Sequence, residues 1–388
     1  MRCQSGVNGM ASRQIAIVGA GIGGMAAAIA LHRRGISVAI FEQAQAFRRI
    51  GAAINLTPNA VRVLDGLGVG QHLRAASFSP EFRVSRTWDT GEETLRLEMG
   101  KLALHKYGSP QLMVHRADLL TALENALPAG AVHLNSRLIA VDQTAHGVTI
   151  HLEDGTRRRF DGLIAADGIH STVRQLLFEA PDLTYTGMVA YRDILPTARL
   201  GNYEYQSFVK WWGPTLKSQL VTAAINGGSE LFVFATKEEP EISRESWSAK
   251  AEIEDLRAAF AGYHAEARQV LAECQAPLKT ALYVRAPLHS WEAGRVALLG
   301  DACHAMVPFM AQGAAMGLED AAVLARCLER DENIESAMKA YVAVRKQRAS
   351  RIQQASSENE WLRSSGNADW VYEYDAWSIP IEGDCLTA

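Results

Sequence analysis

The sequence predicts an α/β protein that combines a parallel-sheet domain, a smaller and mainly antiparallel sheet, and a long C-terminal helix. Residues 13–43 run as an apolar strand, a glycine-rich turn, a helix and a second apolar strand, which indicates a βαβ unit. Residues 207–212 and 230–236 are rich in aromatic and branched side chains and are predicted to be strands. Residues 334–362 contain no glycine or proline and are predicted to form one helix.

The composition is that of an ordinary globular protein, and the chain is long enough for two domains. Of its 388 residues, 48% are hydrophobic and 21% are charged. The formal net charge is -4, so we expect neither a nucleic-acid partner nor a membrane-surface partner. No stretch of the sequence reaches the roughly 18 uncharged apolar residues that a membrane span needs.

The first residues of the chain and the cysteines indicate the cellular compartment in which the protein is expected. Residues 1–14 lack the apolar core of a secretory signal, and we expect a short leader there. The five cysteines form no CxxC pair, which predicts neither a disulfide framework nor a metal site, and a cytoplasmic location is expected. The five are Cys3, Cys274, Cys303, Cys327 and Cys385.

The glycines of the first turn follow the spacing GxGxxG, and each has a separate mechanical role. Gly19 permits the tight turn, Gly21 lets the backbone approach a pyrophosphate, and Gly24 lets helix and strand pack closely. Glu42 ends the second strand, where a carboxylate accepts hydrogen bonds from an adenosine ribose. The unit therefore predicts dinucleotide binding, and the acid favours FAD or NAD over NADP.

Two later stretches choose between these cofactors. The stretch 162–177 begins with an apolar strand that leads into Asp167. The stretch 294–328 begins with another apolar strand, which ends at Asp301 and is followed by a loop and a long helix. A carboxylate at a strand end can bind a sugar hydroxyl. Gly313 opens a long helix, whose N-terminal N–H groups would stabilise the negative charge of a reduced isoalloxazine ring. These features favour FAD.

The ordered motifs resemble one known family. "GAGIGG…E", "ADGIHSTVR" and "LLGDACHAMVPFMAQGAAMGLEDA" are similar to motifs of the FAD-dependent aromatic hydroxylases, the group A flavoprotein monooxygenases. Residues 51–69 resemble the family's active-site loop and following helix, and residues 114–123 resemble the stretch whose arginine reaches FAD. The resemblance runs from about residue 13 to 377 and is strongest to 6-hydroxynicotinate 3-monooxygenases, with salicylate hydroxylases next.

The resemblance implies a bound FAD and a transient NADH or NADPH, because the sequence has no second GxGxxG. It also implies a Rossmann-like FAD domain of the para-hydroxybenzoate hydroxylase type with an inserted antiparallel substrate domain. The expected FAD domain comprises 13–80, 102–184 and 284–345, the substrate domain 81–101 and 185–283, and the C-terminal helix and tail 346–388. The expected FAD-binding residues are Gly19, Gly21, Gly24, Glu42, Arg116, Asp167, Asp301, Gly313 and Ala314.

The implied reaction is hydroxylation of a small aromatic or heteroaromatic acid with NAD(P)H and O2, through a flavin C4a-hydroperoxide, with or without decarboxylation. The substrate would resemble 6-hydroxynicotinate or salicylate. A hydroxylase of another heterocycle, such as a purine or quinolone, is a second interpretation, and a flavin-binding module without hydroxylase activity is a third. The long C-terminal helix is a candidate contact for a homodimer.

The substrate site is expected between the flavin and the antiparallel sheet. Asn55 lies where the 6-hydroxynicotinate enzymes carry a histidine, and Lys217 lies near the place of another, so the base of those enzymes is not reproduced. Asn55 and Lys217 nevertheless remain candidates for contacting substrate, the latter as anchor or base.

Three further candidates complete the expected site. His304 follows the GD motif on the flavin-side loop, where it contacts ligand or only fixes the loop, and Pro308 is expected to cap the substrate ring over the flavin. Arg192 is a candidate carboxylate anchor, but strand alternation allows only one of Tyr191 and Arg192 to face the pocket.

Overall fold

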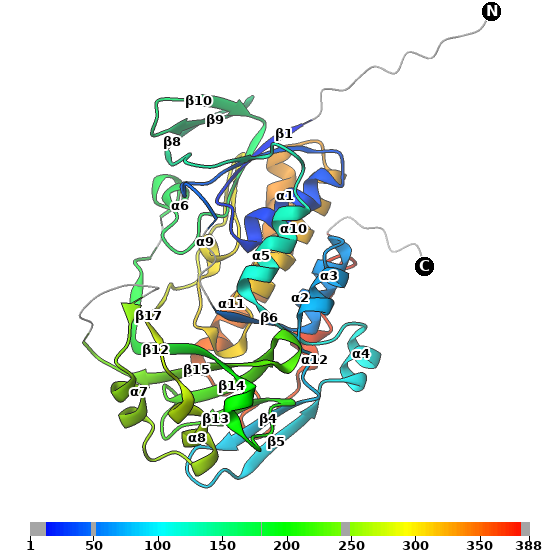
Figure 1. Cartoon of the computed structure of the whole chain (residues 1–388). Coiled ribbons are helices and arrows are strands. Elements are labelled where there is room, and N and C mark those ends of the chain that lie inside the picture. The colour runs from blue at the N-terminus through cyan, green and yellow to red at the C-terminus, as the bar shows by residue number, and fades with distance from the viewer. Residues whose placement is uncertain (1–12, 48–51, 180, 242–248, 382–388) are drawn as a thin grey trace, which may run out of the picture.

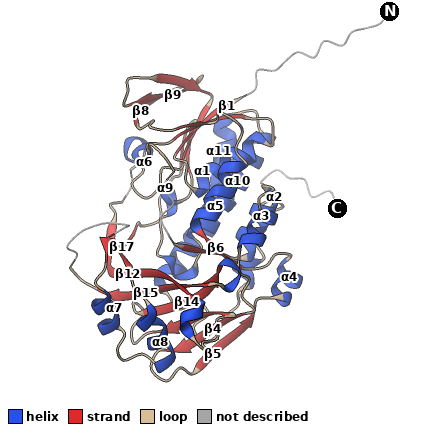
Figure 2. Cartoon of the chain, in the orientation of Figure 1, coloured by secondary structure: helices blue, strands red, loops and turns tan. Residues whose placement is uncertain are grey.

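The computed structural model describes residues 13–47, 52–179, 181–241 and 249–381, and it has two sheet-centred halves (Figure 1). Most of the long helices lie around the parallel sheet in one half, and the largest sheet fills the other (Figure 2). Gly51 in the expected active-site loop, residues 1–12 of the expected leader and residues 382–388 of the tail lie outside the described residues, whereas Gln14 at the end of that leader begins the first strand. The mixed α/β fold that the sequence predicts is confirmed.

The parallel sheet has six strands in the order β18-β19-β11-β1-β2-β7. Its central strands are nearly free of polar side chains and are buried on both faces, as strands covered by helices must be. Only β18 runs antiparallel to its neighbour. The strands are β1 (Gln14–Val18), β2 (Ser37–Phe41), β7 (Val132–His133), β11 (Gly162–Ala165), β18 (Glu292–Ala293) and β19 (Val296–Leu298).

The larger sheet has eight strands in the order β16-β17-β12-β15-β14-β13-β4-β5. All of its pairings are antiparallel except that of β13 with β4. Two distant parts of the chain therefore build one sheet. The strands are β4 (Phe82–Thr87), β5 (Glu93–Glu98), β12 (Thr184–Pro196), β13 (Ser207–Trp212), β14 (Gln219–Ile225), β15 (Glu230–Glu238), β16 (Ala249–Lys250) and β17 (Leu278–Val284).

Two small sheets and the helices complete the described chain. The small sheets pair β3 (Ala53–Leu56) with β6 (Leu112–His115), and β8 (Leu138–Thr144), β9 (Gly147–Leu152) and β10 (Arg157–Phe160) with one another. The α-helices are α1 (Ile22–His32), α2 (Pro58–Gly66), α3 (Gly70–Ala76), α4 (Lys101–Tyr107), α5 (Arg116–Asn125), α6 (Thr172–Leu177), α7 (Ile253–Ala259), α8 (Ala265–Glu273), α9 (Asp301–His304), α10 (Gly313–Arg330), α11 (Ile334–Glu358) and α12 (Asp369–Tyr372). The 3-10 turns are η1 (Thr197–Leu200), η2 (Asn226–Gly228) and η3 (Pro308–Met310).

The eight-stranded sheet has an outer and an inner face. Outer-face residues, including Tyr191 and Trp211, pack with α7 and α8, which lie on the side away from the parallel sheet (Figure 2). Inner-face residues pack with Met113 of β6 and with Phe309 of η3. Since side chains alternate along a strand, Arg192 lies on the inner face and Tyr191 on the outer one.

The helix predicted over 334–362 ends earlier, so its C-terminal boundary was wrong. Helix α11 stops at Glu358 because Asn359 adopts a left-handed conformation (φ 50°) and caps it. The buried side of α11 packs inside this chain, with Met338, Tyr341 and Ile352 in the main core. Among the described residues, no helix combines the length and apolar character needed to cross a membrane.

Glycine permits the close approach of α1 to its turn. At Gly19 φ is +97°, and a Cβ there would meet the Ala166 carbonyl oxygen at 2.3 Å. A Cβ on Gly24 would meet the Gly19 carbonyl oxygen at 2.0 Å. The contact fixes the helix against the turn, as the motif predicts. The assignment of residues to two discontinuous domains stays a prediction.

Gly24→Ala is therefore expected to lower the free energy of unfolding by about 1–3 kcal/mol, because the added methyl group has no room. Gly21→Ala is the matched control: its Cβ would meet no atom within 4 Å, and a change below about 1 kcal/mol is expected. Urea unfolding without added cofactor measures both. Equal losses in the two variants would contradict the steric account.

Candidate active site

The first glycine turn leaves its helix N-terminus accessible. Gly21 is the N-cap of α1, and a Cβ built on it would meet nothing within 4 Å. An anionic group can therefore approach the first N–H groups of α1 closely. Glu42 holds the same turn, because its Oε2 accepts a hydrogen bond from the Ala20 N–H (2.8 Å) and its Oε1 one from the Ala44 N–H (2.8 Å). Its contact with a ribose stays a prediction.

Arg116, Asp301 and Arg192 converge from three different elements. Arg116 begins α5 and Asp301 begins α9, and both are exposed to solvent. Surrounding protein lowers the pKa of the Arg116 guanidinium, while the Asp301 carboxylate raises it. Burial, and then the charge of Arg116, lower the pKa of Arg192, which also donates a hydrogen bond to Thr280 Oγ1. These interactions bring the three charged groups near one another, and the region between them and the inner face of the eight-stranded sheet is called the proposed substrate recess below.

The loop after β11 contributes a buried acid. Asp167 Oδ2 accepts a hydrogen bond from the Val173 N–H (3.2 Å), whereas its Oδ1 is buried and has no protein partner in the described chain. Burial raises the pKa of this carboxyl. Arg174 then ties this loop to the next one, donating to the carbonyl oxygens of Ile169 and Ala302, each at 2.7 Å.

The segment before α10 forms the expected flavin-side loop. Pro308 begins the 3-10 turn η3 and is exposed. Gly313 and Ala314 begin α10 and are half-buried, and a Cβ on Gly313 would meet no atom within 4 Å. The backbone N–H groups at this helix start are thus approachable, which fits a flavin ring. Together with the open Gly21 and the unpartnered Asp167 oxygen, these positions fit an extended FAD.

Asn55 faces the inner face of the eight-stranded sheet. It lies on β3 directly opposite Met113 of β6, and Met113 packs against Phe208 and Val221 of the sheet. Asn55 is 9% exposed, and neither atom of its amide group has a hydrogen-bond partner in the described chain. A buried amide without partners is costly, so the position is suited to a ligand that can hydrogen-bond to it.

Two sequence candidates do not join this group. His304 was expected either to contact ligand or only to fix its loop; its ring turns into the core, where it is fully buried against Asp320, a position suited to fixing the loop. Lys217 lies in the exposed turn between β13 and β14, and its Nζ is 3.8 Å from Glu238 Oε2. The position of His304 follows from the one-turn length of α9, and that of Lys217 follows from the turn between β13 and β14. The residue types alone reveal neither feature.

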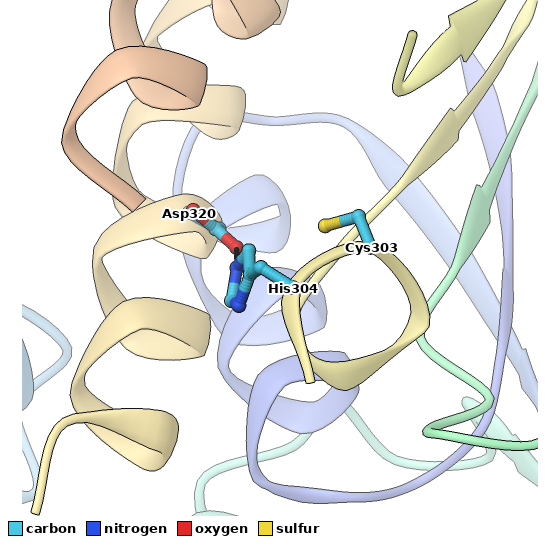
Figure 3. A group of neighbouring side chains, drawn as sticks. All are labelled: Cys303, His304 and Asp320. Carbon is cyan, nitrogen blue, oxygen red and sulfur yellow. Dashed lines mark hydrogen bonds and ion pairs between the residues drawn. The ribbon is translucent and has the colours of Figure 1, made fainter. Parts of the chain in front are cut away.

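His304 instead belongs to a buried ion network behind the recess. Its Nε2 lies 2.6 Å from Asp320 Oδ2 (Figure 3). Arg345 Nε lies 2.8 Å from Asp320 Oδ1. Asp320 Oδ2 also accepts the Gly300 N–H (3.1 Å). Burial alone would raise the pKa of the Asp320 carboxyl, but His304 and Arg345 hold it below its ordinary value. Cys303 donates to the Gly300 carbonyl oxygen (3.3 Å), whereas the buried His304 Nδ1 has no hydrogen-bond partner among the described residues.

The network extends to the start of α10. Glu319 is ion-paired with Arg345 (2.7 Å) and Arg348 (2.8 Å), and its Oε1 accepts a hydrogen bond from Asn59 Nδ2 (2.7 Å). Asn59 also donates to Gln312 Oε1 (2.9 Å), and Gln312 is the N-cap residue of α10. These buried polar residues position the helix start that the flavin ring is expected to meet.

The sequence motifs contained signals for some of these residues. Arg174 is the arginine of "ADGIHSTVR", and Glu319 and Asp320 end the "GLED" stretch of α10. Lys210 is the one charged residue of the apolar run "SFVKWW". None of these side chains was assigned a role from the sequence.

Comparison with known proteins agrees with this arrangement. The family described as FAD binding domain matches residues 12–356. A 6-hydroxynicotinate 3-monooxygenase from Bordetella bronchiseptica is 38% identical, with 95% of this chain and 97% of that protein covered. A salicylate hydroxylase substrate complex superposes with a TM-score of 0.82 at 26% identity, covering 94% and 96%. Klebsiella pneumoniae HpxO with FAD and uric acid gives 0.79 at 25%, covering 89% and 87%.

Asp320→Asn is expected to lower the free energy of unfolding by about 3–5 kcal/mol at pH 6, because it leaves buried cations without their partner. Asp142→Asn is the control: Asp142 is 74% exposed and pairs with His151 at 2.7 Å, so a loss below about 1 kcal/mol is expected. Urea unfolding measures both, and similar losses would contradict the role of burial.

The stability that the buried pair of Asp320 and His304 contributes should depend on pH in a predictable way. Asp320 has a lowered pKa, so its contribution is present above the ordinary aspartate pKa and is lost as pH falls through the folded value. Burial opposes the charge of His304, but Cys303 and Asp320 raise its pKa well above the ordinary value. The stability that His304 contributes is therefore fully present below the ordinary pKa of histidine, and it is lost as pH rises through the raised pKa of His304 in the folded protein. The difference in the free energy of unfolding between native protein and Asp320→Asn should therefore become smaller as pH rises from 6 toward 10.

Proposed function

From the premise that the chain belongs to the FAD-dependent monooxygenases that hydroxylate aromatic rings, we propose that its substrate is a small aromatic acid with a ring hydroxyl. Hydroxypyridine carboxylates and hydroxybenzoates are the expected compounds. The observation that carries this proposal is the position of Arg192 on the inner face of the sheet, within electrostatic range of Arg116. Two guanidinium groups at one recess favour an organic anion.

In this proposal, each residue of the recess contacts a different part of the substrate. Arg192 binds the substrate carboxylate, with its guanidinium fixed by Thr280. Asn55 hydrogen-bonds to a polar group of the ring through its amide. Apolar residues of the inner face, among them Val221 and Phe232, exclude water from the ring.

The FAD-binding residues present the cofactor to this recess. The start of α1 binds the diphosphate, Asp301 binds a hydroxyl of the flavin side chain, and the N–H groups at Gly313 and Ala314 stabilise negative charge on the ring. Bound FAD, once reduced by NAD(P)H, supplies the activation of O2 that puts one oxygen atom into the ring and one into water. Pro308 covers the substrate ring beside it.

A second candidate is hydroxylation of a larger heterocycle such as a purine. Two observations favour it: the structural likeness to the HpxO complex with uric acid, and an asparagine rather than a histidine at position 55. An amide can pair with the donor and acceptor edge of such a ring. Arg192 would then contact a ring oxygen rather than a carboxylate.

A substrate panel tests the proposal. FAD-loaded protein is given NADH or NADPH and one compound at a time: 6-hydroxynicotinate, salicylate, 3-hydroxybenzoate or uric acid. We expect an aromatic acid to accelerate NAD(P)H oxidation and to yield a product that contains one new oxygen atom by mass spectrometry. Acceleration by uric acid alone would favour the second candidate, and acceleration by none would contradict both.

Asn55→His is expected to change the pH dependence of kcat/KM. A histidine adds a group that titrates between about pH 5 and 8, whereas the native amide does not titrate. Asn202→His is the control, because Asn202 is exposed in a loop that supplies none of the site residues named above. A profile that is unchanged in Asn55→His would remove Asn55 from the site.

A further inference from the structure

Lys210 is a buried lysine on the inner face of the eight-stranded sheet. It is 2% exposed, and its Nζ lies 3.5 Å from the centre of the Trp212 ring. Nζ donates a hydrogen bond to Asn359 Oδ1 (2.8 Å), the residue that ends α11. The orientation of that amide is fixed, because Asn359 Nδ2 donates to the Leu216 carbonyl oxygen.

In the described part of the chain, no acid balances this amine. The charged groups that act on it are Arg83 on β4 and Arg363 after α11, and both are cations. Burial, and then these two cations, hold the pKa of Lys210 well below its ordinary value. An unpaired buried lysine is costly in its charged form, so the surroundings of Lys210 favour the neutral amine, the form that can accept a proton.

The position of Lys210 connects it to the proposed substrate recess. On the sheet it lies directly opposite Val221, which packs against Met113, the residue paired with Asn55. From the other side its Nζ lies 5.8 Å from the centre of the Phe309 ring, and Phe309 follows Pro308 on the flavin-side loop. Lys210 is therefore at the inner end of the recess, whereas Arg192, three strands away in the sheet order, belongs to the Arg116 end.

We propose that Lys210 is the base that accepts the proton of the substrate's ring hydroxyl. This inference rests on the proposed function. The hydroxyl O–H bond breaks, its electron pair stays on the ring oxygen, and the proton forms a new bond with Nζ. The neutral amine becomes an ammonium group beside an anionic ring oxygen, and no electrons are exchanged. The ring becomes more electron-rich, Trp212 stabilises the new cation through its face, and Asn359 accepts one of its N–H groups.

This assignment separates the two ends of the substrate. The carboxylate is bound by a permanently charged guanidinium, and the hydroxyl meets a group that can change its charge. Lysine suits the second role because its pKa falls when it is buried. An arginine there would remain charged and could not accept the proton.

Difference absorbance at pH 7 tests the proposal on oxidised, FAD-loaded protein without turnover. The probes are 4-hydroxybenzoate and 6-hydroxynicotinate, added to native protein, Lys210→Met, Lys210→Arg and the control Lys237→Met. Lys237 lies on the other face of the sheet and pairs with Glu239 at 3.3 Å. Melting temperature and bound flavin are measured for each variant, so that loss of folding is recognised.

We expect native protein and Lys237→Met to bind the probes as ring-oxygen anions, with the corresponding absorbance band. Lys210→Met should bind them in the protonated form, whereas Lys210→Arg keeps a cation beside the ring oxygen and should bind the anion by releasing the proton to solvent. With a substrate, kcat of Lys210→Met should fall about 100-fold or more at pH 7 and recover as pH approaches the hydroxyl's own pKa. If the probes bind and ionise equally in native protein and Lys210→Met, the assignment of Lys210 is wrong while the proposed function stands. If neither probe binds native protein, both are wrong.

Discussion

The arrangement of the active site depends on two adjacent acids in the middle of α10. Glu319 and Asp320 are fully buried, and each is neutralised by cations from α11, with His304 of α9 as an additional partner of Asp320. Charges in such a place are tolerated only when nearly every lone pair and proton has a partner. These ion pairs therefore fix the mutual arrangement of the three helices. Because Asp301 begins α9 and Gly313 begins α10, that arrangement also sets where these two residues stand relative to each other.

Local sequence was sufficient to predict the cofactor side of the molecule. The roles of Gly19 and Gly24 follow from backbone sterics within one βαβ unit, and the Cβ positions agree with them. Strand alternation correctly limited the choice to Tyr191 or Arg192, although only packing against α7 and α8 reveals which face is inner. Local rules work here because the relevant contacts lie within a few residues of each motif.

The substrate side depends on contacts between distant segments, and sequence reasoning was weaker there. Helix α11 ends at Glu358 rather than near 362 because the amide of its cap residue Asn359 is engaged by Lys210 and Leu216, which are more than 140 positions away. His304 turns inward because Asp320 lies across from it. Lys210 escaped notice because a lysine between aromatic residues is ordinarily solvated, and its burial arises only when the end of α11 covers it.

The sheet order has a consequence for biosynthesis. Strand β11 pairs on one side with β1, which precedes it in the chain, but its other neighbour, β19, begins only at Val296. Until that part is translated, the hydrogen-bonding groups along one margin of β11 lack their partner strand. Such a margin invites intermolecular association. Nascent chains of this protein thus pass through a long interval of exposure, and slow translation or a shortage of holdase chaperones during it would favour aggregation over the native state.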